Sequence, residues 1–171
     1  MTTLHTIGYE GCSIEDFVST LTRAGISTLI DIRDVPISRK RGFSKRILAG
    51  CLAERGIAYV HLREPGDPKP GREAARRGDI PGFQKIFRSH LAGDEAQDGL
   101  AVALEIAIGS ASCLLCFERD PETCHRTIVA QEVIEETGFE ICNLFADDPD
   151  RYVRNASKLP RFHPGEGLTA A

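Results

Sequence analysis

The chain contains the stretch Leu114-Leu115-Cys116-Phe117-Glu118-Arg119-Asp120-Pro121-Glu122-Thr123-Cys124-His125-Arg126, which predicts a buried strand followed directly by a helix. The apolar run Cys113–Phe117 shows no alternation, as is typical of a strand covered on both faces of a parallel sheet. We expect Asp120 to cap the helix, Pro121 to be its first residue and Gly138 to end it. Thiol, imidazole, carboxylate and guanidinium side chains therefore gather at one strand-to-helix turn.

Strand and helix patterns alternate along the rest of the chain. Short β-prone apolar runs predict further strands at Leu4–Ile7, Thr28–Ile32, Ile57–Leu62 and Phe139–Phe145. Helical spacing predicts buried stripes formed by Ile14, Phe17, Val18 and Leu21, by Ile47, Leu48, Cys51 and Leu52, and by Leu100, Leu104 and Ile108. We therefore expect an α/β fold with a mostly parallel, helix-flanked sheet of about five strands. The single domain should span residues 1–147, and residues 148–171 should form a loosely attached polar tail.

Length and composition limit the classes of protein to consider. A chain of 171 residues fits one domain with a core of its own. The net charge of −4 argues against a surface that coats nucleic acid generally. The chain begins without the layout of a signal peptide, and no run approaches the length of a membrane span. Six cysteines in such a chain are expected to be reduced, so we expect a cytoplasmic protein with no membrane partner.

The segment Arg63–Asp79 shows no hydrophobic periodicity. Proline and glycine interrupt it repeatedly, and it is basic through Lys69, Arg72, Arg76 and Arg77. A structureless loop of this length is uncommon in a compact domain and is usually functional or disordered. We therefore expect an irregular basic loop after the third strand.

Several short motifs, taken together and in order, resemble a known family. They are Thr6-Ile7-Gly8-Tyr9-Glu10-Gly11, Asp31-Ile32-Arg33 with Pro36 and Ser38-Arg39, Gly42-Phe43-Ser44, and Cys116-Phe117-Glu118 with Cys124-His125-Arg126. The chain resembles the bacterial and archaeal family called domain of unknown function 488. It departs from that family at Arg63-Glu64-Pro65-Gly66, where the family often has Leu-Gly. The resemblance implies a compact α/β fold and no settled activity, so function must be inferred from the residues.

Cys124 is the candidate nucleophile. Its expected place in the first turn of a helix, beside Arg126, favours the thiolate because positive potential stabilises the anion. Cys116, at the end of the preceding strand, is a candidate catalytic or resolving partner, and Glu118 is a candidate general base. Both cysteines also fit a plain packing role. The sequence therefore leaves open whether the protein is an enzyme.

Arginines follow the ends of different predicted strands. Arg33, Arg39 and Arg126 carry guanidinium groups, which bind phosphate or carboxylate through two parallel hydrogen bonds. Open α/β sheets bind ligands at the carboxyl ends of their strands, where these residues are expected to meet. Tyr9 follows the first strand and can donate a hydrogen bond there. We expect Tyr9, Arg33, Arg39 and Arg126 to bind a small anionic ligand or phosphate group beside Glu118.

Two alternatives to a thiol enzyme remain. Cys116, Cys124 and His125, with His61 as a fourth ligand, form a candidate zinc or iron site, which would make the chain a redox- or metal-dependent regulatory module. The spacing lacks the two close ligand pairs typical of structural zinc, so our main expectation includes no metal.

The other alternative is a nucleic-acid binding module. Its candidate surface combines the segment Arg39-Lys40-Arg41 with the basic loop. The sequence identifies no cofactor and no oligomeric state under any of these hypotheses.

Overall fold

The computed structural model describes residues 2–146, and the predicted tail over residues 148–171 lies outside them. The elements in chain order are β1 (Thr3–Gly8), α1 (Ile14–Arg23), β2 (Thr28–Asp31), α2 (Lys45–Ala53), β3 (Ala58–His61), α3 (Lys69–Arg76), α4 (Ile80–Leu91), α5 (Asp94–Gly109), β4 (Ser112–Cys116), the short 3-10 helix η1 (Pro121–Thr123), α6 (His125–Thr137) and β5 (Glu140–Leu144). Within this range no helix is both long and apolar enough to cross a membrane.

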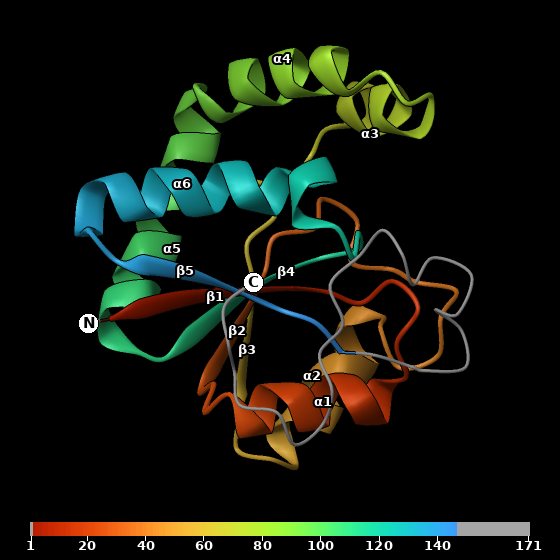
Figure 1. The fold of residues 1–171 in the computed structure, drawn as a ribbon, viewed down its shortest axis with the longest axis vertical. Helices are drawn as coiled ribbons and strands as arrows, with labels where there is room; N and C mark the ends of the chain where they lie inside the picture. Colours follow the sequence, from red (N-terminus) through yellow and green to blue (C-terminus); the bar gives the residue numbers. More distant parts are fainter. Residues whose placement is uncertain (1, 147–171) are drawn as a thin grey trace.

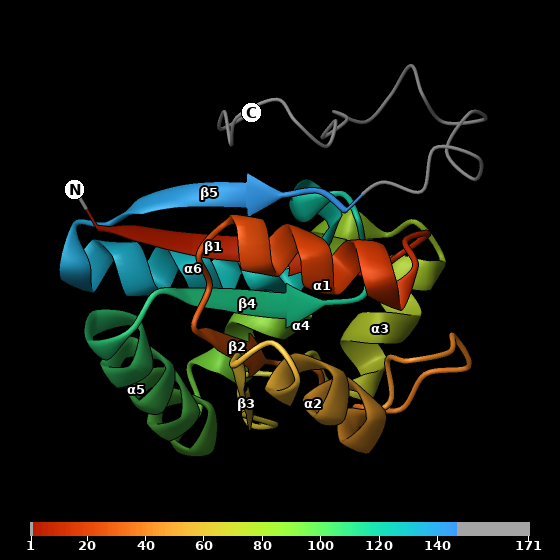
Figure 2. The same cartoon turned by 90° about the horizontal axis from the view of Figure 1, so that it is seen from below.

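All five strands form one parallel sheet in the order β3-β2-β4-β1-β5 (Figure 2). Helices α1 and α2 cover one face of the sheet, and α4 and α6 lie on the other (Figure 1). The predicted α/β fold with a parallel, helix-flanked sheet is therefore confirmed.

The connections diverge at the carboxyl end of β4. β4 leads to α6 on one face, whereas its two neighbours β1 and β2 lead to α1 and α2 on the other face. Loops that leave adjacent strands toward opposite faces open a crevice between them, which is where α/β sheets bind ligands.

Each face of the sheet has its own core. Phe17, Leu21 and Leu52 belong to the core under α1 and α2, and Phe87 and Val129 to the core under α4, α5 and α6. The expected buried positions Ile47 and Ile108 are instead exposed. Helix α5 buries small residues: Ala96, Ala103 and Ala107 belong to the second of these cores, and Gly99 lies against Glu64 and Pro65.

The start of the last helix differs from the prediction. Asp120 accepts a hydrogen bond from the backbone N–H of Glu122, but the turn that it caps is only the 3-10 helix η1. The backbone is extended again at Cys124, and α6 begins one residue later, at His125. Cys124 is thus the N-cap of α6 and not a first-turn residue. Gly138 ends the helix in the left-handed conformation (φ 69°), as predicted.

The segment expected to be a structureless basic loop contains a helix. α3 runs over Lys69–Arg76 although two prolines stand at its start. Pro68 is the N-cap and Pro70 lies in the first turn, where the missing N–H has no helical partner to lose. A helix this short shows no clear periodicity in the sequence, which is why the pattern did not reveal it.

Candidate functional site

A cavity of about 900 Å³ opens at the carboxyl ends of β1, β2 and β4. The loops after those strands supply one part of its wall, and α3 with its flanking residues supplies the other. The residues that line it are Tyr9, Glu10, Arg33, Asp34, Val35, Ile37, Ser38, Arg39, Lys40, Asp67, Arg72, Ala75, Arg76, Ile80, Cys116, Phe117, Glu118, Thr123 and His125.

Arg33 is held in a buried network at the end of β2. Its Nε and Nη2 donate to the two carboxylate oxygens of Asp31 at 2.9 and 2.6 Å, and its Nη1 donates to the Tyr9 hydroxyl at 3.3 Å. The Tyr59 hydroxyl donates to the same carboxylate at 2.5 Å. Arg33 and Tyr9 therefore border the cavity, but the charge of Arg33 is offset by Asp31.

Basic side chains from two segments line another part of the wall. Arg72 donates to Asp34 at 2.6 Å, so its charge is also offset. Arg39 and Lys40 come from the loop after β2, and Arg76 comes from the end of α3. Among residues 2–146, these three side chains form no ion pair.

Asp67 is a carboxyl group that sequence reasoning missed. Its side chain is 6% exposed and its Oδ1 has no hydrogen-bond partner within the described chain. A Cβ atom at Gly71 would overlap Oδ1, so the first turn of α3 leaves room for this carboxyl group. Burial raises the pKa of Asp67 to about 6, although the nearby His125 acts in the opposite direction. A carboxyl group with such a pKa can exchange a proton near neutral pH.

Cys116, Cys124 and His125 form a compact buried cluster beside the cavity. The Sγ atoms of Cys116 and Cys124 lie 3.4 and 3.9 Å from Nδ1 of His125. Glu118 Oε2 lies 2.9 Å from Cys116 Sγ. His61, the fourth metal ligand considered from the sequence, is not part of the cluster, because its ring nitrogens face Arg33 O and Lys45 Nζ.

The structure encloses Cys124, the residue expected to be a reactive thiolate. Cys124 is 2% exposed and does not line the cavity, since His125 lies in the wall instead. Burial raises the pKa of Cys124 well above that of a free thiol, and Arg126 opposes this only in part. Burial also raises the pKa of Cys116. At a deeply buried site the cost of desolvating a thiolate outweighs the benefit of the helix N-terminus.

His125 is fully enclosed beside Cys124. Burial lowers the pKa of His125, but the adjacent Cys124 sulfur, the hydrogen bond with the Ile32 carbonyl and the nearby Glu118 together raise it.

Arg126 lies inside the protein, not on the cavity wall. It is fully buried, and its guanidinium donates to the carbonyls of Glu118 and Arg119 and, at 3.2 Å, to Thr6 Oγ1. It thereby positions the loop that carries Glu118. Arg126 holds this loop through its backbone carbonyls, and its own side chain does not line the cavity.

The structure thus gathers most of the predicted site and adds to it. Tyr9, Arg33, Arg39, Cys116 and Glu118 line one cavity, whereas Cys124 and Arg126 lie behind its wall. Asp67 was missed from the sequence, whereas Arg72 and Arg76, expected in an irregular basic loop, lie on α3. Their position shortly after the third strand was the signal that pointed to this edge of the sheet.

Comparison with known proteins gives one match. The sequence model of a family described as "Domain of unknown function DUF488" matches residues 13–133. No curated protein and no solved structure gives a significant match. The matched range covers well over half of the 171 residues and includes β2, β3, β4 and the start of α6. The chain therefore belongs to the DUF488 family.

Proposed function

We propose that this DUF488 protein binds a small anionic ligand of the phosphate or carboxylate class in the cavity, and that Asp67 exchanges a proton with that ligand. The observation that carries the proposal is a set of three cationic side chains, Arg39, Lys40 and Arg76, on the cavity wall without a carboxylate partner in residues 2–146. Guanidinium and ammonium groups in this situation attract and hold an anion.

The cavity also suits the rest of a small ligand. A volume of about 900 Å³ is within the range of metabolite pockets. Phe117 and Ile37 line it with side chains that are 45% and 74% exposed. Exposed apolar groups in a concave site favour a ligand that also has an apolar or planar part.

Asp67 supplies the chemistry in this proposal. Asp67 lines the cavity, and its pKa of about 6 allows it to accept or donate a proton there. Glu118, the predicted general base, lines the same cavity and is the second carboxyl group in reach of a ligand there.

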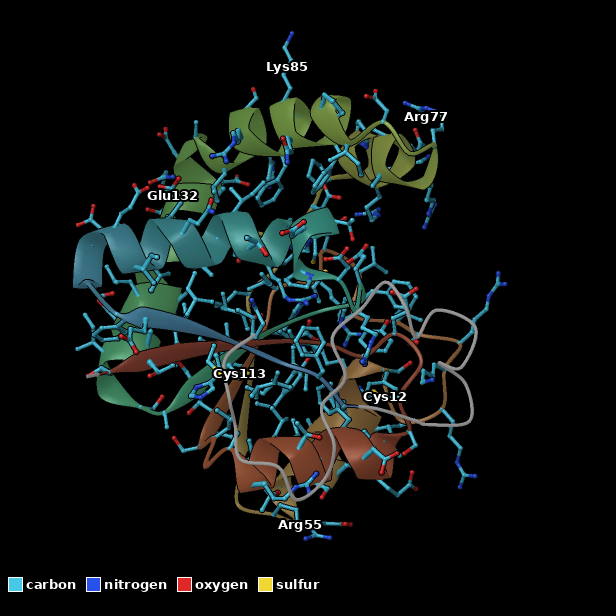
Figure 3. The ribbon with its side chains drawn as sticks, viewed as in Figure 1. Cys12, Arg55, Arg77, Lys85, Cys113 and Glu132 are labelled. Carbon is cyan, nitrogen blue, oxygen red and sulfur yellow. The ribbon has the colours of Figure 1, made fainter. Side chains whose placement is uncertain are left out.

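Calorimetric titration of the full chain with inorganic pyrophosphate tests the anion site. Arg39→Gln and Arg76→Gln should each weaken binding about tenfold, which corresponds to the loss of one charge-assisted contact. The matched control is Arg55→Gln, because Arg55 is exposed and projects into solvent on the α1–α2 side (Figure 3). Equal effects of all three substitutions, or no binding at millimolar pyrophosphate, would contradict the proposal.

Sulfate binding as a function of pH tests the role of Asp67, since sulfate keeps its charge across the range. Ionised Asp67 repels an anion, so sulfate should bind the wild type more weakly as the pH rises through about 6. Asp67→Asn should flatten this profile. A profile that is unchanged in Asp67→Asn would remove Asp67 from the site.

A further inference from the structure

We propose that Cys116, Cys124 and His125 bind Zn²⁺, with the fourth coordination position directed toward the cavity beside Glu118. This inference goes beyond the proposed function and does not depend on an anion binding in the cavity. The three side chains come from the end of β4 and the start of α6, so the fold itself brings them together.

The distances fit a tetrahedral zinc site. One ligand atom from each of the three residues lies within 4.8 Å of the other two. Zinc binds sulfur at about 2.3 Å and imidazole nitrogen at about 2.0 Å, so neighbouring ligand atoms lie roughly 3.5 Å apart. The two Sγ–Nδ1 separations, 3.4 and 3.9 Å, bracket this value. Only small side-chain movements are needed to place an ion between the three atoms.

The second independent observation is the hydrogen bond on the far side of the imidazole. Nε2 of His125 lies 2.9 Å from the carbonyl oxygen of Ile32, so Nε2 carries the proton and donates it. Nδ1 is therefore the nitrogen that faces the two sulfurs. Metal-binding histidines almost always show this arrangement, because the outer hydrogen bond fixes the ring and the tautomer. The Phe87 ring also packs against His125, with centroids 5.2 Å apart.

The surrounding charges fit a bound dication with two thiolates. Zn²⁺ and two thiolates are neutral together, and the carboxylate of Glu118 adds one negative charge. Arg126 is fully buried and donates only to carbonyl and hydroxyl oxygens, so its positive charge has no carboxylate partner in the described chain. The backbone N–H of Arg126 donates to Cys124 Sγ at 3.5 Å, and it belongs to the positive end of α6. These groups stabilise metal-bound thiolates, whose protons are released to solvent.

The ligand set favours zinc and an open site. Two thiolates and one imidazole are borderline-soft ligands, which select Zn²⁺ over Mg²⁺ or Ca²⁺. A site with three protein ligands keeps a fourth position for water or a ligand. Cys116, Glu118 and His125 all line the cavity, so that position faces the space where a ligand binds.

The experiment is metal analysis of the full chain, purified without a polyhistidine tag under reducing conditions. Elemental mass spectrometry after dialysis against Zn²⁺ should give about one ion per chain. Replacement by Co²⁺ should produce the thiolate-to-cobalt absorption of a tetrahedral site. Cys116→Ser and Cys124→Ser should each remove about half of this absorption and lower the affinity at least 10-fold. Circular dichroism of each variant tests whether it is folded.

The matched control is Cys51→Ser, which removes a half-buried thiol on α2, outside the cluster. It should leave both metal content and absorption unchanged. Metal content that is equal in the wild type and in a folded Cys116→Ser protein would overturn the site. So would a reduced, folded wild type that stays metal-free after dialysis against Zn²⁺. Pyrophosphate binding without zinc binding would overturn this inference alone, and zinc binding without any anion binding would overturn the proposed function alone.

Discussion

At the scale of single residues, Cys124 shows how burial outweighs a favourable position. Its sulfur caps α6 and lies near Arg126, and both features favour a thiolate. The sulfur is nevertheless almost completely enclosed, and desolvation raises its pKa well above the usual value. The consequence is a thiol that does not react unless a metal or local opening changes its environment.

The first prediction concerns the rates at which the cysteines react with iodoacetamide at neutral pH, with a chelator present. Cys124 and Cys116 should react on the order of tenfold more slowly than Cys51, because both are buried and the pKa of each is raised. Mass-spectrometric mapping measures each rate, and labelling in denaturant provides the control for intrinsic reactivity. Faster labelling of Cys124 than of Cys51 would restore the thiolate hypothesis.

The second prediction concerns the dependence of stability on pH through Asp67. The pKa of Asp67 in the folded protein, about 6, lies above the usual 3.8. Ionisation of the buried carboxyl group therefore lowers the free energy of unfolding, which is highest below about pH 4 and declines as the pH rises to about 6. Asp67→Asn removes this cost. The variant should be more stable than the wild type by about 3 kcal/mol at neutral pH and equally stable below about pH 4.

Chemical unfolding at a series of pH values measures the effect of Asp67→Asn. A stability difference that does not change with pH would mean that the substitution acts through packing and not through ionisation.

At the scale of elements, the end of β1 and the loop after β4 fit together closely. Gly8 pairs with Cys116 in the sheet, and a Cβ atom at Gly8 would overlap the carbonyl oxygen of Glu118. It would also lie 2.8 Å from Nη1 of Arg126. Glu10 accepts a hydrogen bond from the backbone N–H of Arg119 at 2.9 Å, so the same loop is held from both sides. The loop that carries Glu118 is therefore rigidly placed at the cavity.

The third prediction follows from this fit. Gly8→Ala should destabilise the protein by about 3 kcal/mol, because neither the strand nor the buried Arg126 can move away from the added methyl group. The matched control is Gly50→Ala, where a Cβ atom meets nothing within 4 Å. Gly50 lies inside α2, so this control should stabilise the protein by about 0.5–1 kcal/mol. Equal effects of the two substitutions on thermal unfolding would contradict the prediction.

At the scale of the whole molecule, the sheet has a separate apolar core on each face. Phe17 represents the core under α1 and α2, and Phe87 the core under α4, α5 and α6; both are fully buried. The middle strand β4 contributes to both cores, through Leu115 on one face and Leu114 on the other. Because both cores pack on the same strand, we expect that one core cannot unfold without disrupting the other.

The fourth prediction is that both cores unfold in one transition. Phe17→Ala and Phe87→Ala should each destabilise the protein by about 3–5 kcal/mol, with a single cooperative transition in both variants. Calorimetry, with far- and near-ultraviolet circular dichroism as second probes, measures this. Two separated transitions in either variant would show that the faces fold independently.

The order of elements was predictable because it depends on local patterns. Strands of four to six residues and helix α1 left clear patterns, and Gly138 marked a helix end that the structure retains. Alternation of strand and helix then implied a parallel sheet. The short helix α3 was missed because two prolines and a glycine within or beside it are local signals of a loop.

Sequence alone was sufficient to place Tyr9, Arg33, Arg39, Cys116 and Glu118 at one edge of the sheet, because strand ends follow from the chain direction. Tertiary structure decided which groups reach the cavity and in which protonation state. It enclosed Cys124 and Arg126 and brought Asp67 into the wall from a segment with no recognisable pattern. The physical reason is that a pKa and an exposed surface depend on everything packed around a group, whereas a strand or a cap depends on its neighbours in the chain.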